Sequence, residues 1–357
     1  MIRKFYKGKR VLVTGHTGFK GSWLSLWLSD MGAKVIGVAL KPEVKPNHYE
    51  LINLKGLLSR EYLQDIRNFQ AVKRIFENER PEIVFHLAAQ PLVRDSYILP
   101  KDTFDINIGG TVNLLEAIRT TDSVKSAIFI TSDKCYENME WFWGYRENDR
   151  LGGRDPYSAS KGAMEIVCNS YLRSFFAKDA IGPHIGFATV RAGNVIGGGD
   201  WAKDRLIPDC VRALSRRERV VIRNPGSIRP WQHVLEPLYG YLLLGVKLYN
   251  KPNRYSTPFN FGPFEIEHIK VEEVVRMFID IWGEGNYVIK KEKKRMHEAS
   301  LLRLVIDKAV NLLGWRPVLS SSDAIKWTAV WYKKWYEQKR YLINESLQNI
   351  YSYEKMI

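Results

Sequence analysis

The sequence has few cysteines and no long hydrophobic run. Its 3 cysteines, Cys135, Cys168 and Cys210, show no C-x-x-C spacing. This pattern indicates neither a disulfide framework nor a zinc site, so no metal is expected. The longest apolar stretch, near residues 241–246, is far shorter than the ~20 residues that span a bilayer. We therefore expect a protein of the reducing cytoplasm with no membrane partner.

Acidic residues are also scarce relative to basic ones. The chain has 39 Asp and Glu against 54 Lys and Arg, a net charge of +15. Such an excess suits an acidic small molecule, a nucleic acid or an anionic membrane, and composition does not choose among them. The densest basic run, 290–295, contains Glu292 and no interleaved aromatic residue. We interpret it as a solvated face rather than a nucleic-acid site.

Short apolar strands alternate with helical patterns along the first half of the chain. This alternation predicts crossover units and a parallel sheet covered on both faces. The expected fold class is α/β, a Rossmann-type doubly wound sheet with a smaller C-terminal substrate-binding lobe. Strands are expected at 10–15, 33–40, 83–87, 127–130 and 187–191, and helices at 23–31, 69–79, 107–119 and 158–176.

The regular alternation weakens after Val195. Further elements are expected at 208–215 (helix), 220–222 (strand), 235–247, 271–281 and 327–341 (helices), after a glycine-rich loop at 197–204. The length suggests about two domains. We expect residues 1–190 to form the dinucleotide-binding domain, with the chain returning near 228–262. Residues 191–340 would form mainly the substrate-binding lobe, and 341–357 a C-terminal tail.

A glycine triplet, Gly15-x-x-Gly18-x-x-Gly21, follows the first expected strand and opens the first expected helix. Glycine there permits a tight turn, close approach of a pyrophosphate and helix–strand packing, while the helix N-terminus favours the anion. This context indicates a dinucleotide site rather than a plain turn. The expected cofactor-binding residues are Gly15, Thr17, Gly18, Phe19, Lys20, Gly21, Asp65, Ile66, Leu87, Ala88 and Ala89, together with Tyr157 and Lys161.

The end of the second expected strand lacks a carboxylate. Segment 38–41 reads Val-Ala-Leu-Lys, and the next acid is Glu43. An acid at this position usually binds the adenosine ribose. Either the ribose of NAD is held in another way, or the affinity for the cofactor is modest. Lys41 would instead suggest a 2′-phosphate and hence NADP. Asp65 and Ile66 are expected to lie against the adenine.

Tyr157 and Lys161 are four residues apart at the start of an expected helix, and so lie on one face. A lysine cation beside a phenol favours phenolate and lowers the phenol's pKa. The tyrosine can then accept a substrate hydroxyl proton as hydride leaves the same carbon. Ser132, just past strand 127–130 at the ligand-binding edge of the sheet, can hydrogen-bond the reacting oxygen. Asp133 and Lys134 follow it; their alternative role is a helix cap or a surface ion pair.

These residues resemble the extended short-chain dehydrogenase/reductase family. The resemblance rests on the glycine triplet, Asp65-Ile66, segment 86–89, Asn107 and Tyr157-x-x-x-Lys161, and reaches to about Trp335. Segments 14–24, 131–138, 144–149, 191–201, 204–209 and 229–237 narrow it to nucleotide-sugar dehydratases. The resemblance implies a lyase that uses bound NAD to convert CDP-glucose into its 4-keto-6-deoxy product, a step towards dideoxysugars and O-antigen.

The resemblance also implies roles for individual residues. Asp133 protonates the leaving hydroxyl, and Lys134 either removes the C5 proton or stabilises the enolate electrostatically. Asn107 matches the family's structural asparagine near the active site and is expected among the cofactor-binding residues. Helices 107–119 and 158–176 would form the interface of a homodimer or a dimer of dimers. The implied substrate-binding residues are Asn194, Arg205, Arg223 and Arg229, of which any arginine has a surface charge as its alternative.

Two other functions stay open on the sequence. The first is another NAD-dependent nucleotide-sugar dehydratase or an epimerase, although epimerases need no acid–base pair such as Asp133-Lys134. The second is a non-catalytic nucleotide- or RNA-binding protein on the same scaffold. The retained Tyr157 and Lys161 argue against this second function, so no nucleic-acid partner is expected.

Overall fold

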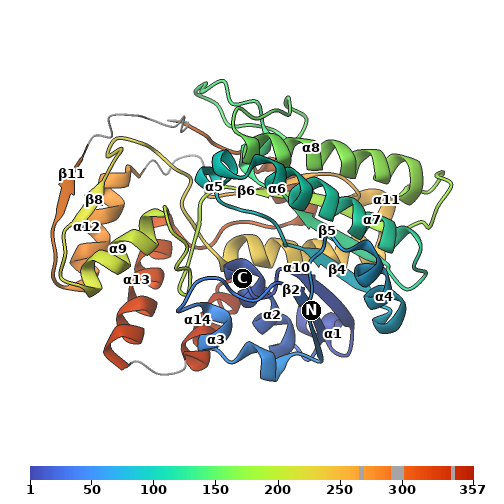
Figure 1. The fold of residues 1–357 in the computed structure, drawn as a ribbon, viewed down its shortest axis with the longest axis horizontal. Helices are drawn as coiled ribbons and strands as arrows, with labels where there is room; N and C mark the ends of the chain where they lie inside the picture. The colour runs from blue at the N-terminus through green and yellow to red at the C-terminus, as the bar shows by residue number, and fades with distance from the viewer. Residues whose placement is uncertain (265–268, 291–300, 339–341) are drawn as a thin grey trace.

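The computed structural model of the chain describes residues 1–264, 269–290, 301–338 and 342–357. Within these ranges, seven parallel strands form one sheet in the order β10-β6-β5-β4-β1-β2-β3 (Figure 1). The order reverses between β1 and β4, the arrangement of a doubly wound sheet. The expected fold class is therefore confirmed. The strands are β1 Arg10–Thr14, β2 Lys34–Ala39, β3 Arg60–Leu63, β4 Ile83–His86, β5 Ser126–Ile130, β6 Gly186–Ala192 and β10 Phe259–Phe261.

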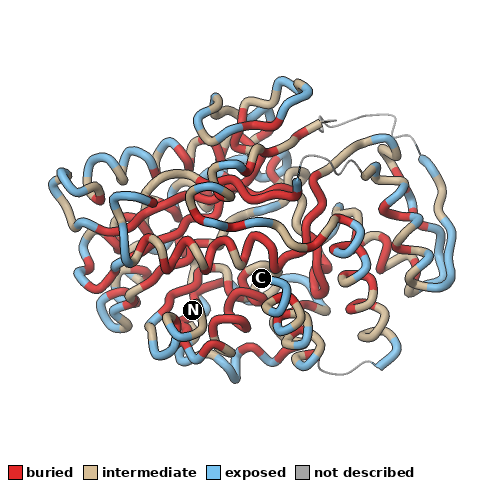
Figure 2. Tube along the Cα trace, turned by 180° about the vertical axis from the view of Figure 1, so that it is seen from behind, coloured by how far each residue is buried: buried red, intermediate tan, exposed pale blue. Residues whose placement is uncertain are grey.

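Helices cover both faces of the sheet. One face packs against α4 (Phe69–Glu79), α7 (Thr111–Arg119) and α8 (Pro156–Tyr171). The other packs against α2 (Phe19–Asp30) and α10 (Leu235–Asn250). Because no face meets water, central strands are buried along nearly their whole length (Figure 2). The expected helices at 107–119 and 158–176 are continuous but include π-helical turns, η2 (Asp105–Gly110) and η4 (Leu172–Phe176).

Helix α8 has a well-defined start. The Asp155 carboxylate accepts from the backbone N–H of Ser158 at 2.9 Å, and Pro156 occupies the first turn. An acidic N-cap satisfies an otherwise unpaired amide, and proline loses no hydrogen bond there. The cap sets Tyr157 and Lys161 in the first two turns, beside the carboxyl end of β5.

A smaller group of elements lies at one end of the molecule, on the left of Figure 1. It consists of α9 (Leu206–Ser215), β8 (Val220–Ile222), α12 (Val271–Trp282), β11 (Tyr287–Ile289) and α13 (Ser321–Gln338). The short parallel pair β7 (Val195–Ile196) and β9 (Gln232–His233) links it to the sheet region. The structure confirms the elements expected here, and their first and last residues differ from the expected ones by at most six positions. Residues 339–341 of the expected terminal helix, and 291–295 of the basic run, lie outside the described residues.

Several elements were not expected from the sequence. The segment 341–357 contains a helix, α14 (Ile343–Glu354), whose Tyr353 hydroxyl donates to buried Glu236 at 2.7 Å. Glu354 accepts from the Trp27 indole at 2.8 Å, so α14 packs on the main core. The other helical elements that the sequence analysis did not predict are all short: α1 (Ile2–Tyr6), α3 (His48–Leu51), η1 (Leu54–Leu57), α5 (Val93–Ile98), α6 (Pro100–Phe104), η3 (Asp133–Cys135), α11 (Pro252–Tyr255) and η5 (Ala309–Leu313).

All three cysteines are buried and free, which confirms that no disulfide joins them. Among the helices that the structure describes, none is long and apolar enough to cross a bilayer.

Three of the four buried histidines predict that the fold is sensitive to acid. Burial lowers the pKa of His48, His86 and His233 to about 3. Below pH ~6.5 the unfolded chain binds protons that the folded chain does not, so each histidine removes about 1.4 kcal/mol of stability per pH unit down to pH ~3. Glu236, whose pKa burial raises to about 7, acts in the opposite direction. The net result is a falling melting temperature between pH 6 and pH 4.

A substitution isolates the histidine contribution. His48 pairs with Ser22 at 2.8 Å and Ser346 at 3.0 Å, and His48→Gln keeps a polar side chain without the titration. We expect this variant to be less stable at pH 7 but to lose less stability on acidification. Exposed His184 provides the control, because His184→Gln should leave the slope unchanged. Equal slopes in all three proteins, measured by thermal melts, would contradict the explanation.

Candidate active site

The turn between β1 and α2 is packed too tightly for side chains. Gly15 has φ +75°, and a Cβ on it would lie 2.8 Å from the Ala88 nitrogen. A Cβ on Gly21 would lie 2.0 Å from the Gly15 carbonyl oxygen. Gly18, by contrast, is exposed at the start of α2, and its Cβ would meet only that same oxygen, at 3.3 Å. The first-turn amides of α2 thus face an open position that fits a pyrophosphate.

A second network underlies this turn and was not found from the sequence. Buried His16 pairs with the Glu61 carboxylate at 3.1 Å, and Tyr49 donates to the same carboxylate at 2.6 Å. Gly37 leaves room for the imidazole, since a Cβ there would lie 2.7 Å from the His16 ring. The only sequence feature that could have indicated this network is His16 after the first glycine, together with Gly37 in the adjacent strand β2. Thr17 fixes the outer side of the turn by donating to the Leu40 carbonyl at 2.9 Å.

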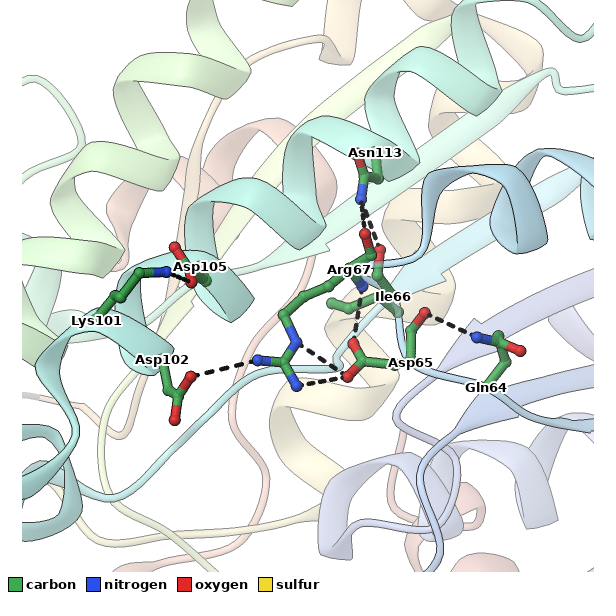
Figure 3. Close-up of polar contacts among 8 residues, drawn as sticks. All are labelled: Gln64, Asp65, Ile66, Arg67, Lys101, Asp102, Asp105 and Asn113. Carbon is green, nitrogen blue, oxygen red and sulfur yellow. Dashed lines mark hydrogen bonds and ion pairs between the residues drawn. The ribbon is translucent and has the colours of Figure 1, made fainter.

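The segment expected near the adenine is held by its own neighbours (Figure 3). The Asp65 carboxylate accepts from the Arg67 guanidinium at 2.7 and 2.9 Å, and this pairing lowers the pKa of Asp65. Asn113 of α7 donates to the Ile66 carbonyl at 2.9 Å. The side chain of Asp65 is thus engaged by Arg67, while the backbone of Ile66 is fixed against α7. Contact of this segment with adenine stays a prediction.

Tyr157 and Lys161 are both buried beside the end of β5. Burial raises the pKa of the Tyr157 phenol to about 12, opposed by a hydrogen bond with Ser132 and by the Arg205 cation. Burial lowers the pKa of Lys161 to about 8, and its ammonium donates to the Ile130 carbonyl at 3.3 Å. The expected lowering of the phenol's pKa by Lys161 is therefore not what the structure has. Desolvation of the phenolate outweighs the nearby positive charges.

Asp133 and Lys134 lie in η3, directly after β5. The Ser132 hydroxyl donates to Asp133 at 2.9 Å and accepts from the Lys134 amide at 3.2 Å, so Ser132 rather than Asp133 caps this turn. Asp133 is only 4% exposed, which excludes a surface ion pair. Burial raises its pKa despite the opposing charges of Lys134 and Arg229. A carboxyl group in this state is suited to donate a proton.

Lys20 lies within the electrostatic influence of two further cations, Arg205 and Lys161, and of Asp133. Burial lowers the pKa of Lys20 to about 8, and the charges of Arg205 and Lys161 lower it further, while Asp133 raises it. Lys20 of the glycine turn therefore shares one electrostatic environment with Lys161 of α8. Such a concentration of positive charge, removed from water, suits an anionic ligand.

The expected substrate-binding residues are distributed unequally. The charge of Arg205 lowers the pKa of Tyr157, and the charge of Arg229 lowers that of Asp133. Arg205 also pairs with Asp200 at 2.7 Å. Arg223 instead faces Asp204 at 3.3 Å and Asp209 at 3.6 Å.

The chain segment around Asn194 closes over Asp133. The Asn194 carbonyl accepts from Gln232, joining β7 to β9. A Cβ on the preceding Gly193 would lie 2.6 Å from Pro230 and 3.5 Å from an Asp133 carboxylate oxygen. Because residue 193 is glycine, its segment can lie against both Pro230 and Asp133. No motif in the sequence predicted this contact.

Asn107 joins the π-helical turn to α8. Its amide donates to the Ser160 hydroxyl at 2.8 Å and to the Gln90 carbonyl at 3.1 Å, and its oxygen accepts from the Gln90 amide at 2.8 Å. The Ser96 hydroxyl similarly accepts from the Tyr157 amide at 3.2 Å. Gln90 and Ser96 were not expected, because nothing in their local sequence marks contacts with residues so far along the chain.

Comparison with known proteins matches this architecture. The model of the NAD dependent epimerase/dehydratase family matches residues 11–255. The chain is 47% identical to the CDP-glucose 4,6-dehydratase of Salmonella typhimurium over 342 residues, covering 96% of this chain and 95% of that protein. The chain therefore belongs to the NAD dependent epimerase/dehydratase family. This membership confirms NAD, rather than NADP, as the expected cofactor.

Solved structures show the same fold. UDP-glucose 4-epimerase of Thermotoga maritima, solved with UDP-glucose, is 25% identical with a TM-score of 0.78, covering 91% of this chain and 99% of that one. dTDP-glucose 4,6-dehydratase of Bacillus anthracis, solved in complex with NAD, is 20% identical with a TM-score of 0.75, covering 92% and 97%.

The packing of the glycine turn predicts which substitution abolishes NAD binding. Gly21→Ala forces a methyl group against the Gly15 carbonyl, so α2 must shift away from the turn. We expect NAD affinity, measured by calorimetric titration, to fall at least about 10-fold, which corresponds to about 1.4 kcal/mol. Gly109→Ala is the control, because a Cβ at Gly109 meets nothing within 4 Å. Unchanged NAD affinity in Gly21→Ala would refute the assignment of this turn.

Proposed function

We propose that this protein converts CDP-glucose into CDP-4-keto-6-deoxyglucose by removing water across C5 and C6. The observation that carries the proposal is a buried Asp133 with a raised pKa, beside Lys134 and the Tyr157–Lys161 pair. A redox pair alone would serve many reactions of the family. A proton-donating carboxyl at the same point adds what elimination of a hydroxyl requires. The 47% identity to the Salmonella typhimurium dehydratase supports the same substrate.

Tyr157 and Ser132 act on the C4 oxygen in this proposal. The Tyr157 phenolate accepts the C4 hydroxyl proton, and Ser132 holds the oxygen by a hydrogen bond. NAD held at the glycine turn between β1 and α2 would supply reversible hydride transfer at C4 and C6, so the overall reaction would be redox-neutral. Lys161 and Lys20 stabilise the negative charge of the phenolate until the proton arrives, because both cations are held out of water nearby.

Asp133 and Lys134 act on the elimination step. Asp133, whose pKa burial raises, donates its proton to the leaving C6 hydroxyl. Lys134, on the adjacent residue of η3, removes the C5 proton or stabilises the enolate that forms. Both act on neighbouring carbons of one sugar, which their consecutive positions in a single short turn allow.

The anionic diphosphate is assigned to the arginines near this group. Arg205 and Arg229 bind the diphosphate, and Arg223, the residue after β8, binds it as well. Asn194 contacts the sugar. Guanidinium groups suit phosphate because they donate two parallel hydrogen bonds. In this assignment residues 1–190, with the chain returning through α10 and β10, bind NAD, while 191–340 mainly hold the sugar nucleotide. Pairing of β10 with β6 supports the return.

The assembly and setting are further parts of the proposal. Helices α7 and α8 form the interface of a homodimer or a dimer of dimers, and Ile166 on α8, 61% exposed, supports an apolar contact there. The protein works in the cytoplasm, where its three free cysteines remain reduced. Its product supplies dideoxysugar synthesis for O-antigen.

Turnover of a set of nucleotide sugars tests the substrate. Purified protein incubated with CDP-glucose should form a 4-ketosugar, detected by the absorbance that it develops in alkali. UDP-glucose and dTDP-glucose should give no such absorbance. Tyr157→Phe serves as the inactive control, with a loss of at least about 100-fold expected for a general base. Activity on another nucleotide sugar alone would assign a different dehydratase. Inversion at C4 without loss of water would assign an epimerase, and salt-sensitive RNA binding without turnover a binding protein.

Replacing Lys134 separates the two chemical stages. Lys134→Met should leave C4 oxidation measurable, as reduced nucleotide in a single turnover, while product forms at least about 100-fold more slowly. Elimination stops because the side chain no longer carries a group that can accept or stabilise charge. Lys178→Met, on an exposed loop lysine, should match the parent protein. Full-rate elimination in Lys134→Met would remove this residue from the mechanism.

A further inference from the structure

A buried ion pair lies beneath the catalytic residues and takes no part in the chemistry above. The Arg191 guanidinium of β6 donates to the Glu165 carboxylate of α8 at 2.7 and 2.9 Å, and both side chains are 2% exposed. Such pairs add little net stability, because removing two charges from water offsets their attraction. Glu165 lies one helical turn beyond Lys161. The contacts of this buried ion pair therefore indicate another role.

The carboxylate of the buried ion pair binds the residue that follows β5 and a residue within β6. The hydroxyl of Thr131 donates to one Glu165 oxygen, and the hydroxyl of Thr189 to the other, at 2.7 Å. Thr131 directly precedes Ser132. A single carboxylate on α8 thus fixes Thr131, where the chain leaves β5 and enters residues 132–136, the catalytic turn.

The guanidinium of the buried ion pair holds the other end of that turn. Arg191 donates to the Tyr136 hydroxyl at 2.7 Å and to the Glu147 carbonyl at 3.0 Å. Tyr136, in turn, donates to Asn260 at 2.8 Å. Because Tyr136 follows η3, the catalytic turn is tied to the buried ion pair on both sides.

We propose that the buried ion pair is a positioning device that keeps segment 132–134 in register with α8, through Thr131 and Tyr136. The inference deepens the proposed function and rests on it for the reaction that is measured. Tyr157 and Ser132 act at C4, while Asp133 and Lys134 act at C6 and C5 of the same sugar, so α8 and segment 132–134 must keep one mutual geometry. A shift of ~1 Å between such groups costs about 100-fold in rate. Neither ion-pair residue contacts the reacting atoms, so both are positioning residues.

Two threonines provide a matched test that leaves the ion pair itself intact. Thr131→Val and Thr189→Val each remove one buried hydroxyl from Glu165 without unpairing a charge. We expect Thr131→Val to lower kcat at least about 10-fold with KM nearly unchanged, because only Thr131 adjoins the catalytic turn. Thr189→Val should lose similar thermal stability but keep kcat within about 3-fold, and Thr131→Ser should restore kcat. Equal losses of kcat in the two valine variants, or a change confined to KM, would overturn the proposal.

A second readout separates this inference from the substrate assignment. The amides of Lys134, Cys135 and Tyr136 all bond within the catalytic turn. Their hydrogen exchange should accelerate in Thr131→Val but not in Thr189→Val, with no substrate present. If the parent protein fails to turn over CDP-glucose, the proposed function fails while this comparison still decides the positioning role. Identical exchange across the turn in both variants would show that the carboxylate does not hold it.

Discussion

Removal of charged groups from water is the constraint on which the active site depends. Desolvation is the largest influence on Asp133, Tyr157, Lys161 and Lys20 alike, and in each case it favours the neutral form. The same burial thus makes the carboxyl and the phenol harder to ionise and the ammonium groups easier to deprotonate. The shared surroundings of these groups, rather than their intrinsic chemistry alone, therefore shift their pKa values.

This burial follows from the architecture of the sheet. The carboxyl ends of β1, β4 and β5 meet where the strand order reverses, and helices cover both faces. The smaller lobe then closes the exposed end, with Gly193 allowing its chain to lie against Asp133. The position of ligand binding is thereby a property of topology, while its chemistry depends on which side chains the strand ends present.

Local pattern predicted much of this from the sequence. The glycine spacing predicted the tight turn between β1 and α2, alternating apolar segments predicted the parallel sheet, and Tyr157 with Lys161 marked one end of α8. What the pattern could not predict depends on contacts across long stretches of chain. The pKa of Tyr157 is higher than expected because burial outweighs the Ser132 hydrogen bond and the Arg205 charge, and burial is a property of the whole fold. The His16–Glu61 pair and the clasp of Glu236 by α14 likewise leave no periodic trace.

The last helix has a consequence for how the chain can be made. Arg3 of α1 binds the Glu354 carboxylate at 2.8 Å, and Glu354 also accepts from Trp27 in α2. This polar partner of the first two helices therefore leaves the ribosome more than 300 residues after them. The packing of α1 and α2 cannot be completed until residues 353 and 354 have emerged. Truncation before residue 353 should thus impair the packing of residues near the beginning of this sequence.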